Sequence, residues 1–207
     1  ADRFVSALAP KVRALKIGQY DEPGVEMGPV ITRESKERVT DYINQGEADG
    51  ATVVVDGRGL SLQGYEDGFF VGGTLLDHVT ADMSVYRDEI FGPVLSVLRP
   101  KTYEEAVNLV MTHEYGNGTA IFTRDGDAAR EFANNVNVGM VGVNVPIPVP
   151  VAYHSFGGWK ASMFGDHSIH GMEGVRFYTK LKTVTARWPS GIKDGAVFNF
   201  HSGSETK

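Results

Sequence analysis

The chain has 207 residues, enough to bury one sizeable core, so we expect one domain with an appended arm. Hydrophobic residues make up 42% of it and charged residues 22%, which is ordinary for a soluble globular protein. The net charge of −6 and the pI near 5.5 argue against a nucleic-acid-binding protein. No apolar run reaches the ~20 residues that cross a bilayer, and no signal peptide is visible. We therefore expect a cytoplasmic protein with no membrane partner.

Two helices and a strand are predicted in the first 55 residues. An apolar stripe with helical spacing opens the chain, although Pro10 should kink or split that helix. After a loop over 16–25, Thr32 can cap a second helix, which should end near Gly46 and Gly50. Residues 51–55 then have the composition of a buried strand. The apolar faces of the two helices are formed by Phe4, Leu8, Val12 and Leu15, and by Val39, Tyr42 and Ile43.

The stretch from Arg87 to Leu95 joins charged residues to an apolar segment that only Gly92-Pro93 interrupts. This pattern predicts a polar loop that leads into a buried strand over 94–98. Glu89 and Phe91 are two residues apart, so in an extended segment their side chains point the same way. A carboxylate can accept hydrogen bonds from both hydroxyls of a sugar diol, and an aromatic ring beside it offers a flat wall. The pair indicates a site for a ligand with a sugar and a heteroaromatic ring.

Helices alternate with strands further along the chain. Thr102 and Glu105 form a capping-box pattern before a strongly periodic helix. A strand over 119–123, a helix capped by Asp125 and a strand over 139–144 follow, and this alternation predicts an α/β fold with a parallel sheet. There is no Gly-x-Gly-x-x-Gly and no P-loop, so a phosphate-cradling part should lie elsewhere. The apolar face of the helix capped by Asp125 is predicted to be Ala129, Phe132, Ala133 and Val136.

Several motifs, in order along the chain, resemble those of the NAD(P)-dependent aldehyde dehydrogenases. Residues 89–93 resemble the family's Glu-Ile-Phe-Gly-Pro, and residues 156–162 resemble its Phe-Gly-Gly-x-Lys-x-Ser. Residues 68–75 resemble Gly-Tyr-Phe-x-x-Pro-Thr, with Gly73 in place of the proline. Met163 replaces the glycine that usually follows the serine. The resemblance runs from about Met27 to Trp188, which is most of the chain.

The resemblance implies a three-layer, parallel-sheet catalytic domain over 1–174, incomplete at its N-terminus. Side chains alternate between two faces from Phe177 to Trp188, which predicts an oligomerisation strand over 175–188, because a lone terminal strand needs a sheet edge to join. We therefore expect a homo-oligomer, a dimer or a tetramer. Residues 189–207 should form a loose tail.

The resemblance also implies roles for single residues. Glu89 would hold the nicotinamide ribose of NAD, Phe91 would lie by the nicotinamide, and Phe156 would line the substrate pocket. Arg38 is placed to reach the ribose side as well, although a solvated helix arginine is the commoner case. No catalytic residue is assigned, because the family's nucleophile is a cysteine and this chain has none. We interpret the chain, which begins at Ala1, as the C-terminal part of a protein more than twice as long, inactive when alone.

The proline-rich ribbon over 144–150 points to a branch of the family. Its alternating prolines hold the backbone extended, and with residues 115–122 and 164–166 it resembles the branch that acts on methylmalonate semialdehyde. This implies an NAD-dependent, CoA-acylating reaction of valine or inositol catabolism. A cysteine thiolate attacks the aldehyde, hydride passes to NAD, and coenzyme A, the co-substrate, takes the acyl group. With loss of carbon dioxide the product is propionyl-CoA, or acetyl-CoA from malonate semialdehyde.

Two other functions remain open. The first is a hydrolytic NAD(P)-dependent semialdehyde dehydrogenase, which would use water in place of coenzyme A. The second is a non-catalytic oligomerisation module, formed by these 207 residues alone. The missing first domain should leave apolar surface exposed, so we expect the isolated chain to self-associate. His167 and His170 show no further ligands, so no metal site is predicted. His113, His154 and His201 likewise have no companions that would complete a metal site.

Overall fold

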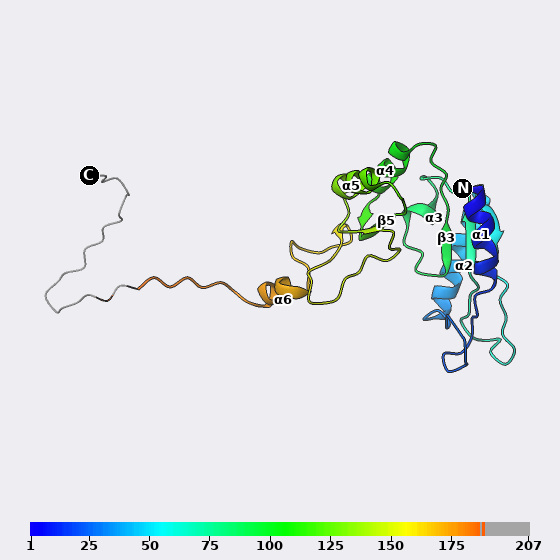
Figure 1. Ribbon diagram of the computed structural model, residues 1–207. Helices are drawn as coiled ribbons and strands as arrows, with labels where there is room; N and C mark the ends of the chain where they lie inside the picture. Colours follow the sequence, from blue (N-terminus) through cyan, green and yellow to red (C-terminus); the bar gives the residue numbers. More distant parts are fainter. Residues whose placement is uncertain (187, 189–207) are drawn as a thin grey trace.

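The computed structural model describes residues 1–186 and 188. Its first part is a three-stranded sheet with two long helices packed on it (Figure 1). The helices are α1 (Asp2–Arg13) and α2 (Arg33–Ala48), and the strands are β1 (Thr52–Val55), β2 (Thr74–Asp77) and β3 (Val94–Ser96). The middle strand, β2, is antiparallel to β1 and parallel to β3.

Successive residues of β2 bury their side chains in two different cores. Leu75 packs with Val5 of α1, whereas Leu76 packs with Val39 and Ile43 of α2. Both leucines are fully buried, as expected for neighbouring strand residues whose side chains point to opposite faces. This part of the chain therefore has three layers: helix, sheet and helix.

The first helix continues through Pro10 as one element, so the predicted kink or split does not break it. Pro10 lies near its end, and the Ala14 N–H donates to the Pro10 carbonyl at 3.1 Å, so helical hydrogen bonding resumes beyond the ring. The buried side chains are Val5 and Ala9, while Phe4 is 57% exposed. The apolar face is therefore rotated by about one residue from the predicted one.

The second helix begins as predicted, because Thr32 Oγ1 accepts a hydrogen bond from the Ser35 N–H at 3.1 Å. It does not end at Gly46, which is buried inside it. A Cβ at Gly46 would lie 2.9 Å from Val85 Cγ1, in the short helix α3 (Ser84–Arg87), so glycine here permits helix packing. The end comes at Ala48, shortly before Gly50.

The second part contains the predicted strand–helix–strand unit. It consists of β5 (Gly118–Ile121), α5 (Gly126–Asn135) and β6 (Met140–Val143), and β5 is parallel to β6. Asp125 caps α5 by accepting a hydrogen bond from the Asp127 N–H at 2.8 Å. Phe132 and Val136 are buried in a third core, whereas Ala133, predicted to be buried, is exposed.

The helix α4 (Tyr103–Thr112) connects the two parts. Thr102 Oγ1 accepts a hydrogen bond from the Glu105 N–H at 3.2 Å, as the capping-box pattern predicts. The Glu105 carboxylate accepts a hydrogen bond from the Lys101 N–H, one residue before the expected donor, the Thr102 N–H. None of the residues of α4 is fully buried, so its apolar face is only partly covered by the described chain.

The described strands form three small sheets, and not all of their pairings are parallel. In one of them β4 (Tyr115–Gly116) is antiparallel to β7 (Trp159–Lys160). The β1–β2 pair is also antiparallel, because no helix lies in the 56–73 connection to carry the chain across the sheet. The predicted parallel geometry holds for β2–β3 and β5–β6. No helix among the described residues is long and apolar enough to cross a membrane.

The last described helix, α6 (Gly171–Tyr178), corrects the predicted start of the terminal strand. Phe177 and Tyr178 form its last turn, so the alternation that begins at Phe177 does not describe a strand there. Residues 179–186 lead away from the rest of the molecule (Figure 1) and pair with no strand in the described part of the chain. Residue 187 and the predicted tail, 189–207, lie outside the described residues.

Candidate functional site

The predicted site segment lies between α3 and β3. Glu89 and Phe91 are exposed on either side of the buried Ile90, so both side chains lie on the solvent side. The segment is not a plain extended one, because Phe91 has a φ of +54°, which is uncommon for an aromatic residue. Phe91 is 78% exposed. Gly92 permits close packing rather than a left-handed turn: a Cβ there would lie 2.5 Å from Val39 Cγ2.

Helix α2 holds the backbone of this segment. Arg38 Nη1 donates to the Glu89 carbonyl at 3.2 Å, and the Tyr42 hydroxyl donates to the Asp88 carboxylate at 3.1 Å. Burial, and then the neighbouring Asp88 carboxylate, raise the pKa of the Tyr42 hydroxyl, so it remains a donor. Arg38 is therefore more than a solvated helix arginine, since it fixes the segment that carries Glu89.

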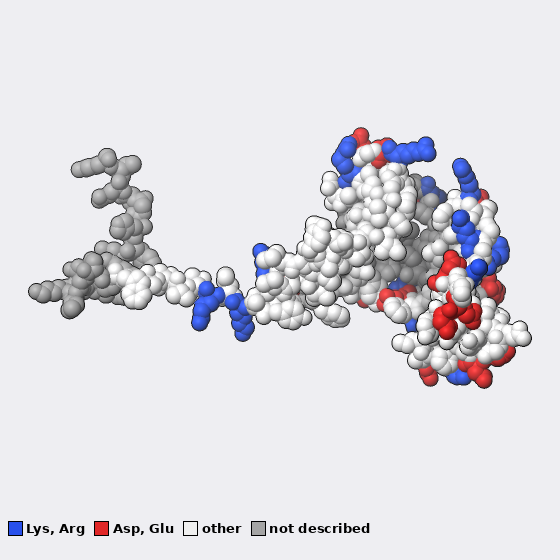
Figure 2. Space-filling view, turned by 60° about the horizontal axis from the view of Figure 1, so that its bottom comes forward, with Lys and Arg blue, Asp and Glu red and all other residues white. Residues whose placement is uncertain are grey.

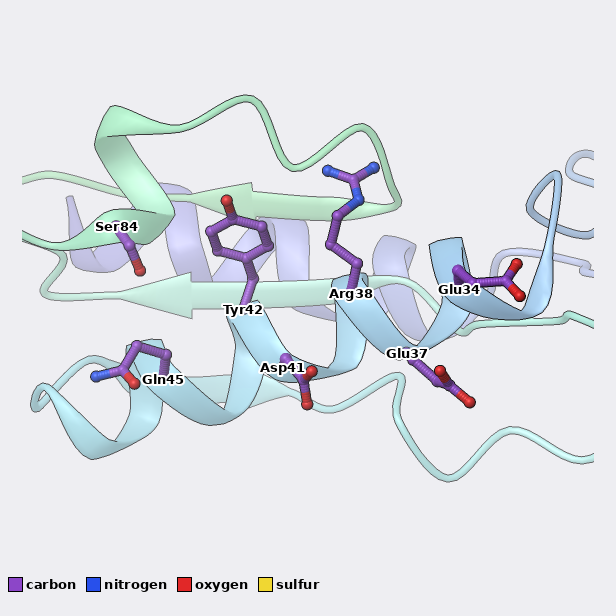
Figure 3. Close-up of a pocket in the computed structure, with 7 residues that line it drawn as sticks. All are labelled: Glu34, Glu37, Arg38, Asp41, Tyr42, Gln45 and Ser84. Carbon is purple, nitrogen blue, oxygen red and sulfur yellow. The ribbon is translucent and has the colours of Figure 1, made fainter.

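These two side chains also line an open hollow of about 420 Å³ on α2. Figure 3 shows Arg38 and Tyr42 extending from α2 toward the α3–β3 segment, while Glu37 and Asp41 project from the helix in another direction. Ser84 of α3 closes one end. The other lining residues are Glu34 and Gln45. With three carboxylates and one arginine already bound to a carbonyl, this hollow does not suit an anion.

A second hollow, of about 470 Å³, lies where three distant segments of the chain meet. We call it the Glu89 groove. Residues of the α3–β3 segment, residues around β4 and residues that follow β7 line it, and we call the first and the last of these sets its two walls. Its lining residues are Asp88, Glu89, His113, Tyr115, Asn117, Ala161, Ser162 and Phe164. The predicted site residue Glu89 lines it, whereas Phe91 and Phe156 do not.

His113 connects the sides of the Glu89 groove. Its Nε2 lies 3.1 Å from the Tyr86 carbonyl, and its Nδ1 accepts a hydrogen bond from the Tyr115 N–H at 3.1 Å. Because Nδ1 accepts, Nε2 carries the proton and donates to Tyr86. Both tyrosine rings contact the imidazole, with centroids 4.9 Å and 5.9 Å away. These contacts make His113 part of the groove, a role that the sequence did not indicate. Its carbonyl partner is 27 residues away, which no local pattern marks.

Phe156 lies in a separate place, half-buried, with its ring stacked on His170 at a centroid distance of 4.3 Å and an interplanar angle of 9°. The backbone that follows it runs tightly against the start of β6, because a Cβ on Gly139 would collide with the Gly157 carbonyl. The two glycines of the motif have close neighbours of their own: a Cβ on Gly157 would lie 2.6 Å from Ser168 Oγ, and one on Gly158 would lie 2.6 Å from Ser162 Cβ. The structure brings Phe156 together with His170, a partner that the sequence did not indicate.

The other histidine of this region has a simple partner. His167 Nδ1 lies 2.6 Å from the Glu173 carboxylate, which also pairs with Arg176 Nη1 at 2.6 Å. Residues 1–186 and 188 contain no group of three or more side chains placed to hold a metal ion. His167 belongs to a surface cluster of polar side chains at α6.

Comparison with known proteins gives the class of this chain. The model of the aldehyde dehydrogenase family matches residues 1–184, so the chain belongs to the aldehyde dehydrogenase family. A solved structure from Sinorhizobium meliloti, described as a methylmalonate-semialdehyde dehydrogenase complexed with NAD, superposes with a TM-score of 0.90 at 60% identity. The match covers 93% of this chain and 39% of that one. The expected aldehyde dehydrogenase fold is confirmed.

Curated proteins similar to this chain include semialdehyde dehydrogenases. The malonate-semialdehyde dehydrogenase of Pseudomonas aeruginosa is 58% identical over 189 residues, which are 91% of this chain and 38% of that protein. The mitochondrial, acylating methylmalonate-semialdehyde/malonate-semialdehyde dehydrogenase of Bos taurus is 46% identical over 188 residues, 91% of this chain and 35% of that protein. The chain therefore spans 35% to 38% of the length of these relatives.

Proposed function

We propose that this chain is part of an NAD-dependent, CoA-acylating dehydrogenase of methylmalonate or malonate semialdehyde. The observation that carries the proposal is the 58% identity to a malonate-semialdehyde dehydrogenase, in a chain whose Glu-Ile-Phe-Gly-Pro motif places Glu89 in a groove. The acylating relative from Bos taurus supports coenzyme A as the acyl acceptor.

The residues of the α3–β3 segment suit the nicotinamide end of NAD. Glu89 offers a carboxylate that can accept hydrogen bonds from both hydroxyls of a ribose, and Phe91 exposes an apolar face close by in the sequence. The chain has no phosphate-cradling motif, so these residues would hold the nicotinamide riboside alone. Bound NAD supplies a hydride acceptor. Glu89 and Phe91 contribute by orienting it, which lowers the entropic part of the barrier.

The proposed reaction is balanced without any further oxidant. Methylmalonate semialdehyde, coenzyme A and NAD⁺ give propionyl-CoA, carbon dioxide and NADH. The aldehyde carbon is oxidised to a thioester, its hydride passes to NAD⁺, and the carbon–carbon bond to the carboxylate breaks. A proton takes the place of the lost carboxylate, matched by the proton that the coenzyme A thiol gives up. Phe156, supported by the His170 ring, would line the pocket for the semialdehyde.

The test uses the full-length protein that contains this chain. NADH formation is followed with methylmalonate semialdehyde in the presence and absence of coenzyme A, and the acyl product is identified by mass spectrometry. We expect NADH formation that requires coenzyme A and yields propionyl-CoA. Turnover without coenzyme A and a free acid product would instead assign the hydrolytic reaction. The isolated 207-residue chain is the control and should form no NADH, since it has no cysteine nucleophile.

A further inference from the structure

We propose that Lys160 is a positioning residue of the Glu89 groove. Its ammonium group clamps the C-terminal end of α4 and thereby fixes the wall formed by residues 161–164 relative to the wall that carries Glu89. The inference rests on the proposed function, because the width of this groove matters to the enzyme only if the groove holds the nicotinamide end of NAD.

The clamp consists of three hydrogen bonds from one ammonium group. Lys160 Nζ donates to the carbonyls of Val110 at 3.0 Å, Met111 at 3.2 Å and His113 at 3.1 Å. An ammonium group has three N–H donors, so all of them are used. The last carbonyls of a helix have no partner within the helix, and the negative end of its dipole favours a cation. Lys160 meets both needs at the end of α4.

The backbone around Lys160 transmits this contact to the groove wall. β7 pairs with β4, the Ala161 N–H donates to the Glu114 carbonyl at 3.3 Å, and the Gly116 N–H donates to Ser162 Oγ at 3.1 Å. Lys160 itself has a φ of +54°, a strained conformation that persists only where the surroundings enforce it. Ala161 and Ser162, the next two residues, line the Glu89 groove. The hydrogen bonds of the Lys160 ammonium group therefore hold this wall in place as well as Lys160 itself.

The wall that carries Glu89 is anchored to the same helix end. The Tyr86 hydroxyl donates to the Leu109 carbonyl at 3.0 Å, and the His113 ring binds the Tyr86 carbonyl. Tyr86 lies in α3, three residues before Glu89. The end of α4 is therefore a common anchor: Lys160 ties one wall to it, and Tyr86 ties the other.

The first test measures cofactor affinity of the full-length protein by calorimetry with NAD and no aldehyde. Lys160→Met keeps the length of the side chain and removes the ammonium group. We expect the dissociation constant for NAD to rise about tenfold, because a smaller fraction of the protein then has residues 161–164 in the position that binds NAD. Lys160→Arg keeps the charge, but a planar guanidinium does not meet three converging carbonyls, so it should restore part of the affinity. Lys11→Met, which removes an exposed lysine of α1, is the matched control and should bind as the wild type does.

The second test separates local positioning from general stability. In the cofactor-free protein, amide hydrogen exchange at Ala161 and Tyr115 should quicken in Lys160→Met, while exchange at Leu76 in the first core stays unchanged. Equal quickening at all three positions, or wild-type NAD affinity in the folded variant, would overturn the inference. If Lys160→Met does not fold, the Lys160→Arg comparison decides by the same two readouts. A wild-type protein that binds no NAD would instead refute the proposed function, and it would be recognised before any variant is compared.

Discussion

At the scale of single residues, Glu89 has two separate connections. Its backbone carbonyl is bound by Arg38 of α2, while its side chain lines the groove. The position of the carboxylate is therefore set by a helix that begins more than fifty residues earlier. The buried Ile90 beside it fixes the direction in which the side chain leaves the backbone.

Replacing the carboxylate tests the ligand proposed for it. We expect Glu89→Gln to weaken NAD binding by about 1.5–3 kcal/mol, because a hydrogen bond to a neutral amide oxygen replaces one to a charged group. Fluorescence titration of the full-length protein with NAD measures the loss. Glu131→Gln, an exposed position on α5, should leave the affinity unchanged. Equal affinities of Glu89→Gln and the wild type would remove Glu89 from the cofactor site.

At the scale of elements, an ion pair joins the sheet to α1. Asp77, buried at the end of β2, receives hydrogen bonds from Arg99 Nε at 2.9 Å and Nη2 at 2.6 Å. Arg99, which follows β3, also binds Asp2 in the first turn of α1 at 2.6 Å. The hydrogen bonds from Arg99 are the main cause that lowers the pKa of the Asp77 carboxyl below its ordinary range.

This pair predicts a pH-dependent stability. Because the folded pKa of Asp77 lies below the unfolded value of about 3.9, its stabilisation is complete above that pH and is lost as the pH falls through the folded pKa. Asp77→Asn should lower the free energy of unfolding by about 2 kcal/mol at neutral pH and by less below about pH 4. Urea unfolding of the full-length protein at several pH values measures this, with the exposed Asp41→Asn as the control. A loss that is the same at every pH would contradict the assignment.

The elements that the sequence predicts well are those with local signals. Thr32, Thr102 and Asp125 cap their helices where expected, because a cap and its N–H partner lie within three residues. No local sequence pattern marks the Glu89 groove, because Lys160 and the carbonyls that it binds are 47 to 50 residues apart. The left-handed Phe91 was also missed, because the tertiary contact between its neighbour Gly92 and α2 is not visible in a residue pattern. The terminal strand was misplaced at Phe177, where period-two alternation and the last turn of a helix overlap.

At the scale of the whole molecule, one side lacks charge. The sequence has no charged residue between Glu131 and Lys160, and Figure 2 shows few charged side chains on the part that leads toward α6. Exposed apolar side chains follow one another there: Val145, Ile147, Val149, Val151 and Tyr153. Folded monomers rarely expose apolar patches of this length. This favours the prediction that the chain forms subunit contacts, to which we propose that residues 175–188 contribute.

Two charges placed in that segment test the proposed interface. Leu181 is 97% exposed and Val184 is 77% exposed in the single chain. If they are buried between subunits, replacing both with lysine should shift the full-length protein from a dimer or tetramer to a smaller species, since an unpaired buried charge is costly. Analytical ultracentrifugation measures the mass. Tyr20→Lys, at a position that is 85% exposed in the first part, should not change it. An unchanged oligomer in the double variant would exclude this segment from the interface.

The long separation between Lys160 and its carbonyl partners also gives an order of assembly during synthesis. The first two cores draw their side chains from residues 5–98 and the third from residues 107–141, so each can close before the next is translated. The ammonium group of Lys160, which ties one wall of the Glu89 groove to α4, is translated only after the residues of all three cores. A nascent chain can thus carry Glu89 on closed cores before the wall formed by residues 161–164 has been made. The sequence order therefore allows the Glu89 groove to be the last of these features to form.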